Sequence, residues 1–248
     1  MRLEVFFGHH QLAAGDVSGR VVAVIDVLRA STTIAVALAN GARAVAPFDN
    51  SEDVVTRSKT LVRGEIRLAG ERRMHPIPGF DLGNSPREFT REAVEGKTIL
   101  LSTTNGTRAL LAVQGARDVL VASYVNFSPC LAMLRAAARG GADIAIVCAG
   151  SDRHFSLEDA ACAGRYTRHI TKRLANVDVN DAARACMLVD GKYRDDLEYL
   201  FSISSHGRAL AEAGYAEDLT ICAAVDECPV VPIYADRQIT KLGPERER

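Results

Sequence analysis

Several features that mark large protein classes are absent from this chain of 248 residues. No apolar run approaches the roughly eighteen residues that a membrane-spanning helix needs, so we expect no transmembrane segment and no membrane partner. The first residues, MRLEVFFGHHQL, lack the long apolar core of a signal peptide. We therefore expect a soluble, cytoplasmic protein.

Neither sign of charge is in excess, because 30 basic side chains stand against 31 acidic ones and the formal net charge is -1. A nucleic-acid partner is not expected for such a balance. Any anion that the protein binds must be held by a local cluster of donors rather than by a global field.

The familiar nucleotide and metal motifs are missing as well. There is no G-x-x-x-x-G-K-[ST] loop and no G-x-G-x-x-G after a strand, which argues against the usual modes of nucleotide binding. There is no H-E-x-x-H and no Cys/His cluster, so zinc is not expected. The six cysteines include no C-x-x-C pair and are interpreted as reduced, mostly buried thiols.

What the chain does contain is a regular alternation of apolar runs and helical patterns. This alternation predicts an α/β fold of three layers, α/β/α, around a largely parallel or mixed sheet. We expect one α/β domain over residues 1–240, or two intertwined lobes, followed by a charged tail at 241–248. The expected strands are 20–27, 43–48, 97–102, 118–123 and 142–150. The expected helices are a segment within 31–45 that Gly41 stops, and 51–62, 105–116, 126–141 and 156–174.

One segment, residues 68–89 (LAGERRMHPIPGFDLGNSPREF), does not fit this alternation. It carries three Pro and three Gly and is too long and polar for a simple connection. Segments of this kind in compact domains are usually functional or disordered. We expect an ordered loop beside a site.

Residues 29–45 align without gaps on residues 103–119, at an offset of 74. Gly41-Ala42-Arg43 falls on Gly115-Ala116-Arg117, and each copy follows an apolar strand. We interpret the repeat as a duplicated strand-loop-helix unit.

Polar side chains are concentrated at the strand-to-helix junction of each copy. In parallel sheets ligands bind beyond the carboxyl ends of the strands, and helix starts offer free N–H groups to anions. The two junctions therefore predict an oxyanion site, although Ser and Thr at such positions also serve as ordinary helix caps. The first junction offers Asp26, Arg29, Ser31, Thr32 and Thr33, and the second offers Ser102, Thr103, Thr104, Asn105, Gly106 and Thr107.

Carboxylates supply the other half of the expected chemistry. Asp26 ends a buried strand, and Glu158 and Asp159 stand in the first turn of an expected helix. Carboxylates beside an anion site favour Mg²⁺, with Asp26, Glu158 and Asp159 as its ligands. Acidic residues at a helix start are also favoured by the helix dipole alone. Cys148, at the end of another strand, is an alternative nucleophile.

Five ordered blocks resemble the 2-phosphosulfolactate phosphatase family over residues 3 to 235. They are VIDVLRASTTIAVALANGA, GERRMHPIPGFDLGNSPREF, LLSTTNGTRAL, CAG followed by FSLEDAACAG, and VVPIY. The resemblance implies a Mg²⁺-dependent phosphatase, a three-layer α/β fold and a homo-oligomer such as a dimer. The reaction it implies converts 2-phospho-3-sulfolactate into 3-sulfolactate and phosphate, on a route to coenzyme M.

The blocks also carry site residues by position. Asp26 and Arg29 are the expected catalytic residues, and Arg72 is expected to clamp a sulfonate or carboxylate of the substrate. Attack by water, by Asp26 or by Cys148 remains open, with Cys148 the least favoured. His206 stands where the family pattern has an amide or small polar residue. The expected substrate-binding residues are Ser31, Thr32, Thr33, Arg72, Asn84, Ser85, Thr104, Asn105, Gly106 and Thr107.

Two other functions remain compatible with these residues. One is a phosphatase acting on another small phosphorylated 2-hydroxy acid. The other is a non-catalytic anion-binding protein, which needs the hydroxyl-rich junctions but no metal carboxylates.

Overall fold

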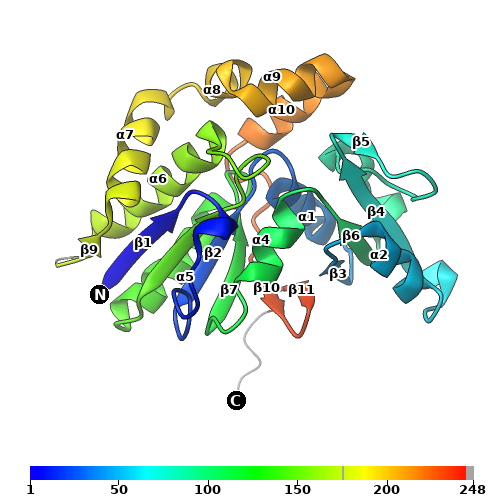
Figure 1. Ribbon diagram of the computed structural model, residues 1–248, viewed down its shortest axis with the longest axis horizontal. Helices are drawn as coiled ribbons and strands as arrows, with labels where there is room; N and C mark the ends of the chain where they lie inside the picture. The colour runs from blue at the N-terminus through cyan, green and yellow to red at the C-terminus, as the bar shows by residue number, and fades with distance from the viewer. Residues whose placement is uncertain (175, 244–248) are drawn as a thin grey trace.

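A twisted, open sheet of mixed direction runs through the computed structural model, which describes residues 1–174 and 176–243 (Figure 1). In these residues the sheet has 11 strands in the order β5-β4-β6-β3-β11-β10-β7-β2-β8-β1-β9. The strands are β1 (Arg2–Phe6), β2 (Val21–Ile25), β3 (Ala44–Pro47), β4 (Ile66–Arg72), β5 (His75–Pro76), β6 (Thr98–Ser102), β7 (Asp118–Ala122), β8 (Ile144–Cys148), β9 (Asp178–Val179), β10 (Pro232–Ala235) and β11 (Gln238–Lys241).

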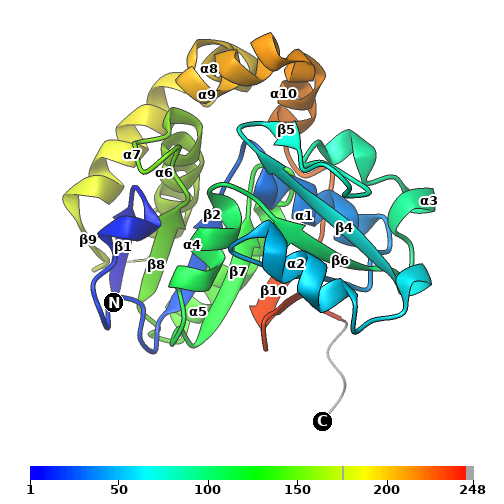
Figure 2. The same ribbon diagram turned by 45° about the vertical axis from the view of Figure 1, so that its right-hand side comes forward.

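Helices cover both faces of this sheet, which confirms the predicted α/β class and its largely parallel strands (Figures 1 and 2). No helix among the described residues is both long and apolar enough to cross a membrane. The helices are α1 (Ala30–Ala39), α2 (Ser51–Ser58), α3 (Arg91–Val94), α4 (Gly106–Ala112), α5 (Phe127–Arg139), α6 (Leu157–Thr171), α7 (Asp181–Tyr193), α8 (Leu197–Ile203), α9 (Ser205–Leu210) and α10 (Ala216–Ala223).

The central strand β2 shows why two helical layers are needed. All five of its residues are buried, as expected for a strand that is covered on both faces. Val21, Ala23 and Ile25 belong to the core beneath α5 and α6, whereas Val22 and Val24 belong to the core beneath α1 and α4.

A hairpin from the end of the chain joins two parallel parts of the sheet. One part is β4-β6-β3 and the other is β7-β2-β8-β1-β9. Between them, β10 pairs antiparallel with β7 through Ile233 and Leu120, and β11 pairs antiparallel with β3 through Ile239 and Val45. Lys241, which the sequence places in the charged tail, pairs with Pro232 at the end of β11, and residues 244–248 of that tail lie outside the described residues.

The two copies of the repeat cross between these parts in opposite directions. The first copy leads from β2 through α1 to β3, and the second leads from β6 through α4 to β7. The starts of α1 and α4 come together, because a Cβ at Gly106 would stand 2.5 Å from the Cβ of Ala30. Only glycine allows this approach, which brings the two polar junctions to one place.

The expectation of a loop over residues 68–89 is wrong for its first part. Residues up to Arg72 continue β4, which pairs with β6, and His75 and Pro76 then pair back as β5. Gly70 obscures this strand in the sequence, and the packing requires glycine there because a Cβ would lie 2.1 Å from the carbonyl oxygen of Ser102. The rest of the segment is ordered loop, held by Asp81, which accepts hydrogen bonds from Leu68 N and Arg63.

The contact between α6 and α7 supports a stability prediction. A Cβ at Gly164 would lie 2.0 Å from the carbonyl oxygen of Cys186, so Gly164→Ala must push the two helices apart. We expect the free energy of unfolding to fall by about 2–3 kcal/mol, measured by chemical denaturation. Gly191→Ala is the matched control, because Gly191 lies in α7 with no atom within 4 Å of its added Cβ and should gain about 1 kcal/mol. Equal stability of the two variants would contradict the close packing.

Candidate active site

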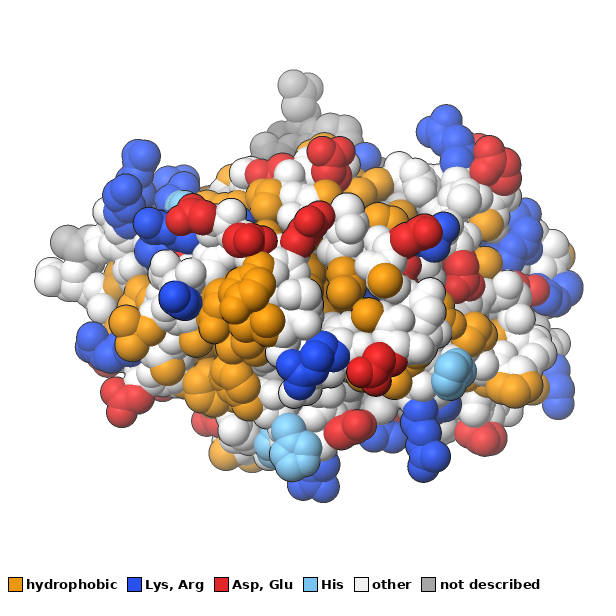
Figure 3. Space-filling model, turned by 90° about the horizontal axis from the view of Figure 1, so that it is seen from above, with side chains coloured by type: hydrophobic (Ala, Val, Ile, Leu, Met, Phe, Trp, Pro, Cys, Tyr) orange, Lys and Arg blue, Asp and Glu red, His pale blue; other side chains and the backbone are white. Residues whose placement is uncertain are grey.

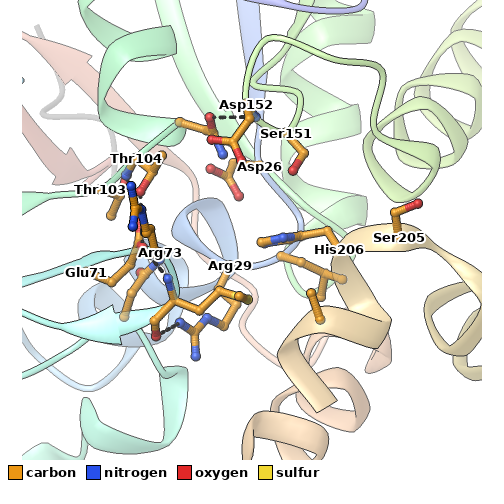
Figure 4. Close-up of a pocket in the computed structure, with 15 residues that line it drawn as sticks. Asp26, Arg29, Glu71, Arg73, Thr103, Thr104, Ser151, Asp152, Ser205 and His206 are labelled. Carbon is orange, nitrogen blue, oxygen red and sulfur yellow. Dashed lines mark hydrogen bonds between the residues drawn. The ribbon is translucent and has the colours of Figure 1, made fainter. Parts of the chain in front are cut away.

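A cavity of about 410 Å³ opens where the carboxyl ends of β2, β4, β6 and β8 face α9 (Figure 4). Residues from six separate segments of the chain line it, and most of them are polar. They are Asp26, Leu28 and Arg29; Glu71, Arg73 and Met74; Asn84; Thr103, Thr104 and Asn105; Ser151 and Asp152; and Ser205, His206 and Ala209.

Asp26 stands at the carboxyl end of β2 and is only 7% exposed. Its Oδ1 accepts a hydrogen bond from Ala30 N (3.2 Å), at the start of α1. Burial, with the neighbouring carboxylates of Glu71 and Glu158, raises the pKa of the Asp26 carboxyl to about 7, against the opposing effects of the Ala30 N–H and of Arg29. A carboxylate in this setting is stabilised by a cation.

Arg29 lines the cavity, but its guanidinium is strongly engaged by the protein. It forms an ion pair with Asp218 of α10 (2.8 Å), in which the side chains are 2% and 1% exposed. It also donates to the carbonyl of Met74 (3.2 Å) and lies 4.3 Å from the ring centroid of Tyr215. The C-terminal helices therefore fix the orientation of Arg29.

Ser31, Thr32 and Thr33 are at most 1% exposed and do not line the cavity. Ser31 Oγ accepts from Asp26 N (2.9 Å), and Thr32 Oγ1 bonds to Ser123 Oγ (2.8 Å). Thr33 Oγ1 donates to the carbonyl of Asn84 (2.9 Å). These hydroxyls hold the junction together, and their contact with substrate stays a prediction.

The second junction reaches the cavity more directly. Thr104 and Asn105 line it, while Gly106 lies behind them, where a Cβ would stand 2.6 Å from Asp26 Oδ2. Glu71 accepts from Thr104 N (2.7 Å) and Thr104 Oγ1 (3.1 Å). Thr107 is turned inward and donates to the carbonyl of Thr103 (2.9 Å).

The two acids predicted at the start of α6 are placed differently. Asp159 accepts from Val27 N (2.8 Å) and Gly150 N (3.1 Å), so it ties the β2–α1 junction to the loop after β8. Burial and the nearby Asp26 raise the pKa of Asp159 well above its usual range. Glu158 is 2% exposed, and its carboxylate lies close enough to raise the pKa of Asp26. Neither residue lines the cavity.

The three residues predicted in the segment 68–89 also separate. Asn84 lines the cavity, is 5% exposed, and its Oδ1 has no hydrogen-bond partner among the described residues. Ser85 donates to Asp218 (2.6 Å), which supports the Arg29 ion pair. Arg72 lies outside the lining and donates to Ser102 Oγ (2.8 Å) and to the carbonyl of Glu71 (2.7 Å).

The oxygen-bearing side chains at the cavity are of the type that binds Mg²⁺. Among the described residues no three His, Cys, Asp or Glu side chains converge into a ready metal centre. Mg²⁺ is usually held by one or two carboxylates, water and substrate oxygens, so fewer protein ligands suffice. Asp26 and Asn84 line the cavity, the buried Oδ1 of Asn84 has no hydrogen-bond partner among the described residues, and Glu158 adds negative charge nearby.

Several lining residues have no counterpart among the predicted site residues. Glu71 belongs to the block GERRMHPIPGFDLGNSPREF, which resembles the family, and no other feature of the sequence points to this residue. Arg73 and Asp152 lie in tight turns with positive φ (50° and 47°), which the sequence does not signal for non-glycine residues. His206 reaches the cavity from α9, whereas His9, His10, His75 and His154 are not part of the lining.

Cys148 does not have the environment of a nucleophile. It is 1% exposed and outside the cavity lining. Burial, reinforced by Asp159, raises the pKa of its thiol well above the usual range. A thiol that stays protonated attacks poorly, so Cys148 is interpreted as a core residue.

Comparison with known proteins agrees with this arrangement. The profile of the family described as 2-phosphosulpholactate phosphatase matches residues 8–237. This chain belongs to the 2-phosphosulpholactate phosphatase family. The match includes every segment that lines the cavity, from Asp26 to Ala209.

Individual members of the family align along nearly their full length. A protein of Symbiobacterium thermophilum is 40% identical over 229 residues, which cover 92% of this chain and 97% of the relative. One from a Synechococcus strain is 40% identical over 235 residues, covering 94% and 95%. One from Caldanaerobacter subterraneus subsp. tengcongensis is 38% identical over 232 residues, covering 94% and 95%. Each is named a probable 2-phosphosulfolactate phosphatase.

Proposed function

We propose that this protein is a Mg²⁺-dependent phosphatase that hydrolyses 2-phospho-3-sulfolactate to 3-sulfolactate and phosphate. Membership of the family and the names of its relatives support the reaction. One structural observation carries the proposal: the two repeated junctions meet so closely that Gly106 of the second packs against Asp26 of the first, at a cavity that both junctions line.

Asp26, with the Oδ1 of Asn84, is the set of oxygen donors that would hold Mg²⁺, and Glu158 would add to the negative potential. When bound, Mg²⁺ supplies charge neutralisation for phosphoryl oxygens. The chain itself orients the phosphate through Thr103, Thr104 and Asn105, which line the same wall. Phosphoryl transfer depends mainly on positioning and charge stabilisation, so a site of this composition suits it.

Arg29 would add positive charge at a fixed place. Its side chain is held by Asp218 and Tyr215, so little conformational entropy remains to be lost when an anion binds. The surrounding surface does not impose a strong field of one sign, because acidic and basic side chains are interspersed on the face seen in Figure 3. The anion is therefore held by the local cluster.

The proposal is tested by assaying phosphate release from 2-phospho-3-sulfolactate and from a panel of other phosphorylated 2-hydroxy acids, with Mg²⁺ and with EDTA. We expect release with Mg²⁺, loss of release in EDTA and the highest kcat/KM for phosphosulfolactate. Faster turnover of a non-sulfonated acid would favour the wider phosphatase function. Binding without turnover of any ester would favour an anion-binding protein. Light scattering on the same sample tests the proposed homo-oligomer.

A further inference from the structure

The cavity is larger than a phosphate group requires. A water molecule takes up roughly 30 Å³ of liquid volume, and a phosphate group with its four oxygens is only a few times larger. The cavity measures about 410 Å³ and extends from the β-strand ends to α9. A substrate whose phosphate lies beside Asp26 therefore leaves its remaining atoms facing α9.

The two sides of the cavity differ in their charged groups. The side formed by the strand ends and the loops after them carries the carboxylates of Asp26 and Glu71 together with the guanidinium groups of two arginines. On the α9 side, Figure 4 shows that the imidazole of His206 points toward the middle of the cavity, whereas the hydroxyl of Ser205 points away. Ala209 is apolar, so His206 is the polar group that α9 directs toward a ligand.

The backbone around His206 is held firmly. Ser204 Oγ accepts a hydrogen bond from Gly207 N (3.0 Å) and caps α9. A Cβ at Gly207 would stand 2.0 Å from the carbonyl oxygen of Phe201, so α9 is packed directly on α8. The imidazole itself is half-buried and makes no hydrogen bond to other described residues. It is thus a positioned donor without a protein partner.

We propose that His206 is a specificity-determining residue, which binds the acid group that the substrate carries in addition to its phosphate. This inference rests on the proposed phosphatase function and assigns to His206 the contact with the carboxylate or the sulfonate of the substrate. The ring N–H donates a hydrogen bond to that group. A hydrogen bond to a charged group contributes more binding free energy than one between neutral groups. Loss of the His206 hydrogen bond should therefore change the selectivity by a measurable amount.

The test compares three esters of similar size: ethyl phosphate without an acid group, 2-phospholactate with a carboxylate, and the phosphate ester of isethionate with a sulfonate. Selectivity is the ratio of kcat/KM for each acidic ester to that for ethyl phosphate. His206→Leu removes the donor and should lower this ratio about tenfold, mainly through KM. The ester that loses more identifies which acid group His206 binds. His206→Arg should restore most of the ratio.

His10→Leu is the matched control, because His10 is exposed and does not line the cavity. Arg73→Gln is the competing variant, since Arg73 also lines the cavity and forms no ion pair with the other described residues. An unchanged ratio in folded His206→Leu overturns the proposal. So does a loss confined to Arg73→Gln, or an equal fall in kcat for all three esters, which would indicate proton transfer by His206. Absence of turnover by the unaltered enzyme would instead contradict the proposed phosphatase function.

Discussion

Asp26→Asn is expected to lower kcat for phosphate release by about a thousandfold, with thermal unfolding showing that the variant is folded. The neutral amide keeps the volume of the side chain and can still accept a hydrogen bond from Ala30 N, which now lies 3.2 Å from Oδ1. It removes the negative charge that would bind Mg²⁺, and loss of such electrostatic stabilisation in a water-poor site costs several powers of ten in rate. Steady-state kinetics over a range of Mg²⁺ concentrations measures the effect.

The free energy of unfolding of Asp26→Asn shows whether its loss of activity arises from the site or from a folding defect. Because the pKa of Asp26 in the folded protein is raised from 3.8 to about 7, its contribution to stability is present below pH 4 and is lost as the pH rises through 7. Without metal, Asp26→Asn should therefore be at least as stable as the unaltered protein at pH 8. Asp118→Asn, at the exposed amino end of β7, should leave activity unchanged. Full activity of Asp26→Asn would contradict the assigned role.

Arg29→Met is expected to lower the free energy of unfolding by about 3–5 kcal/mol and to abolish detectable activity. The substitution leaves the carboxylate of Asp218 buried at 1% exposure without its cation. It also removes the group that lies over Tyr215 and bonds to the carbonyl of Met74. Chemical denaturation and the phosphatase assay measure the two effects separately.

A second substitution tests whether the cost arises from the unpaired charge. Arg29→Met combined with Asp218→Asn should recover much of the stability, because no isolated charge remains, but it should not recover activity. Arg117→Met is the matched surface control, since Arg117 and Asp118 form an exposed pair whose loss costs less than about 1 kcal/mol. Equal losses of stability for Arg29→Met and Arg117→Met would contradict the prediction that the buried ion pair contributes more to stability than the exposed one.

The parallel strands and the helices between them could be predicted because their sequence signals are local. β2, β6, β7 and β8 consist mostly of buried aliphatic residues, and the repeated junctions indicate the place where Asp26 and Gly106 pack together. The hairpin β10–β11 escaped prediction because its turn uses Asp236 and Arg237 at positive φ (49° and 60°), where Asn-Gly would be the recognisable pair.

The direction of side chains at the site could not be derived from the sequence. The hydroxyls of Ser31, Thr32 and Thr33 bond to neighbouring protein groups, and the sequence pattern gives no sign of these partners. Such contacts depend on which distant segment packs against the junction. The ion pair between Asp218 and Arg29 could not be predicted for the same reason, because these two residues lie 189 positions apart in the sequence.

The hairpin between the two parts of the sheet has a consequence for folding. Its strands pair with partners far away in the sequence, because Ile233 pairs with Leu120 and Ile239 pairs with Val45. Until these pairs form, β3 and β7 are open edges of two separate groups of strands. Strand pairs of such long range form slowly, so a partly folded chain exposes both edges to aggregation.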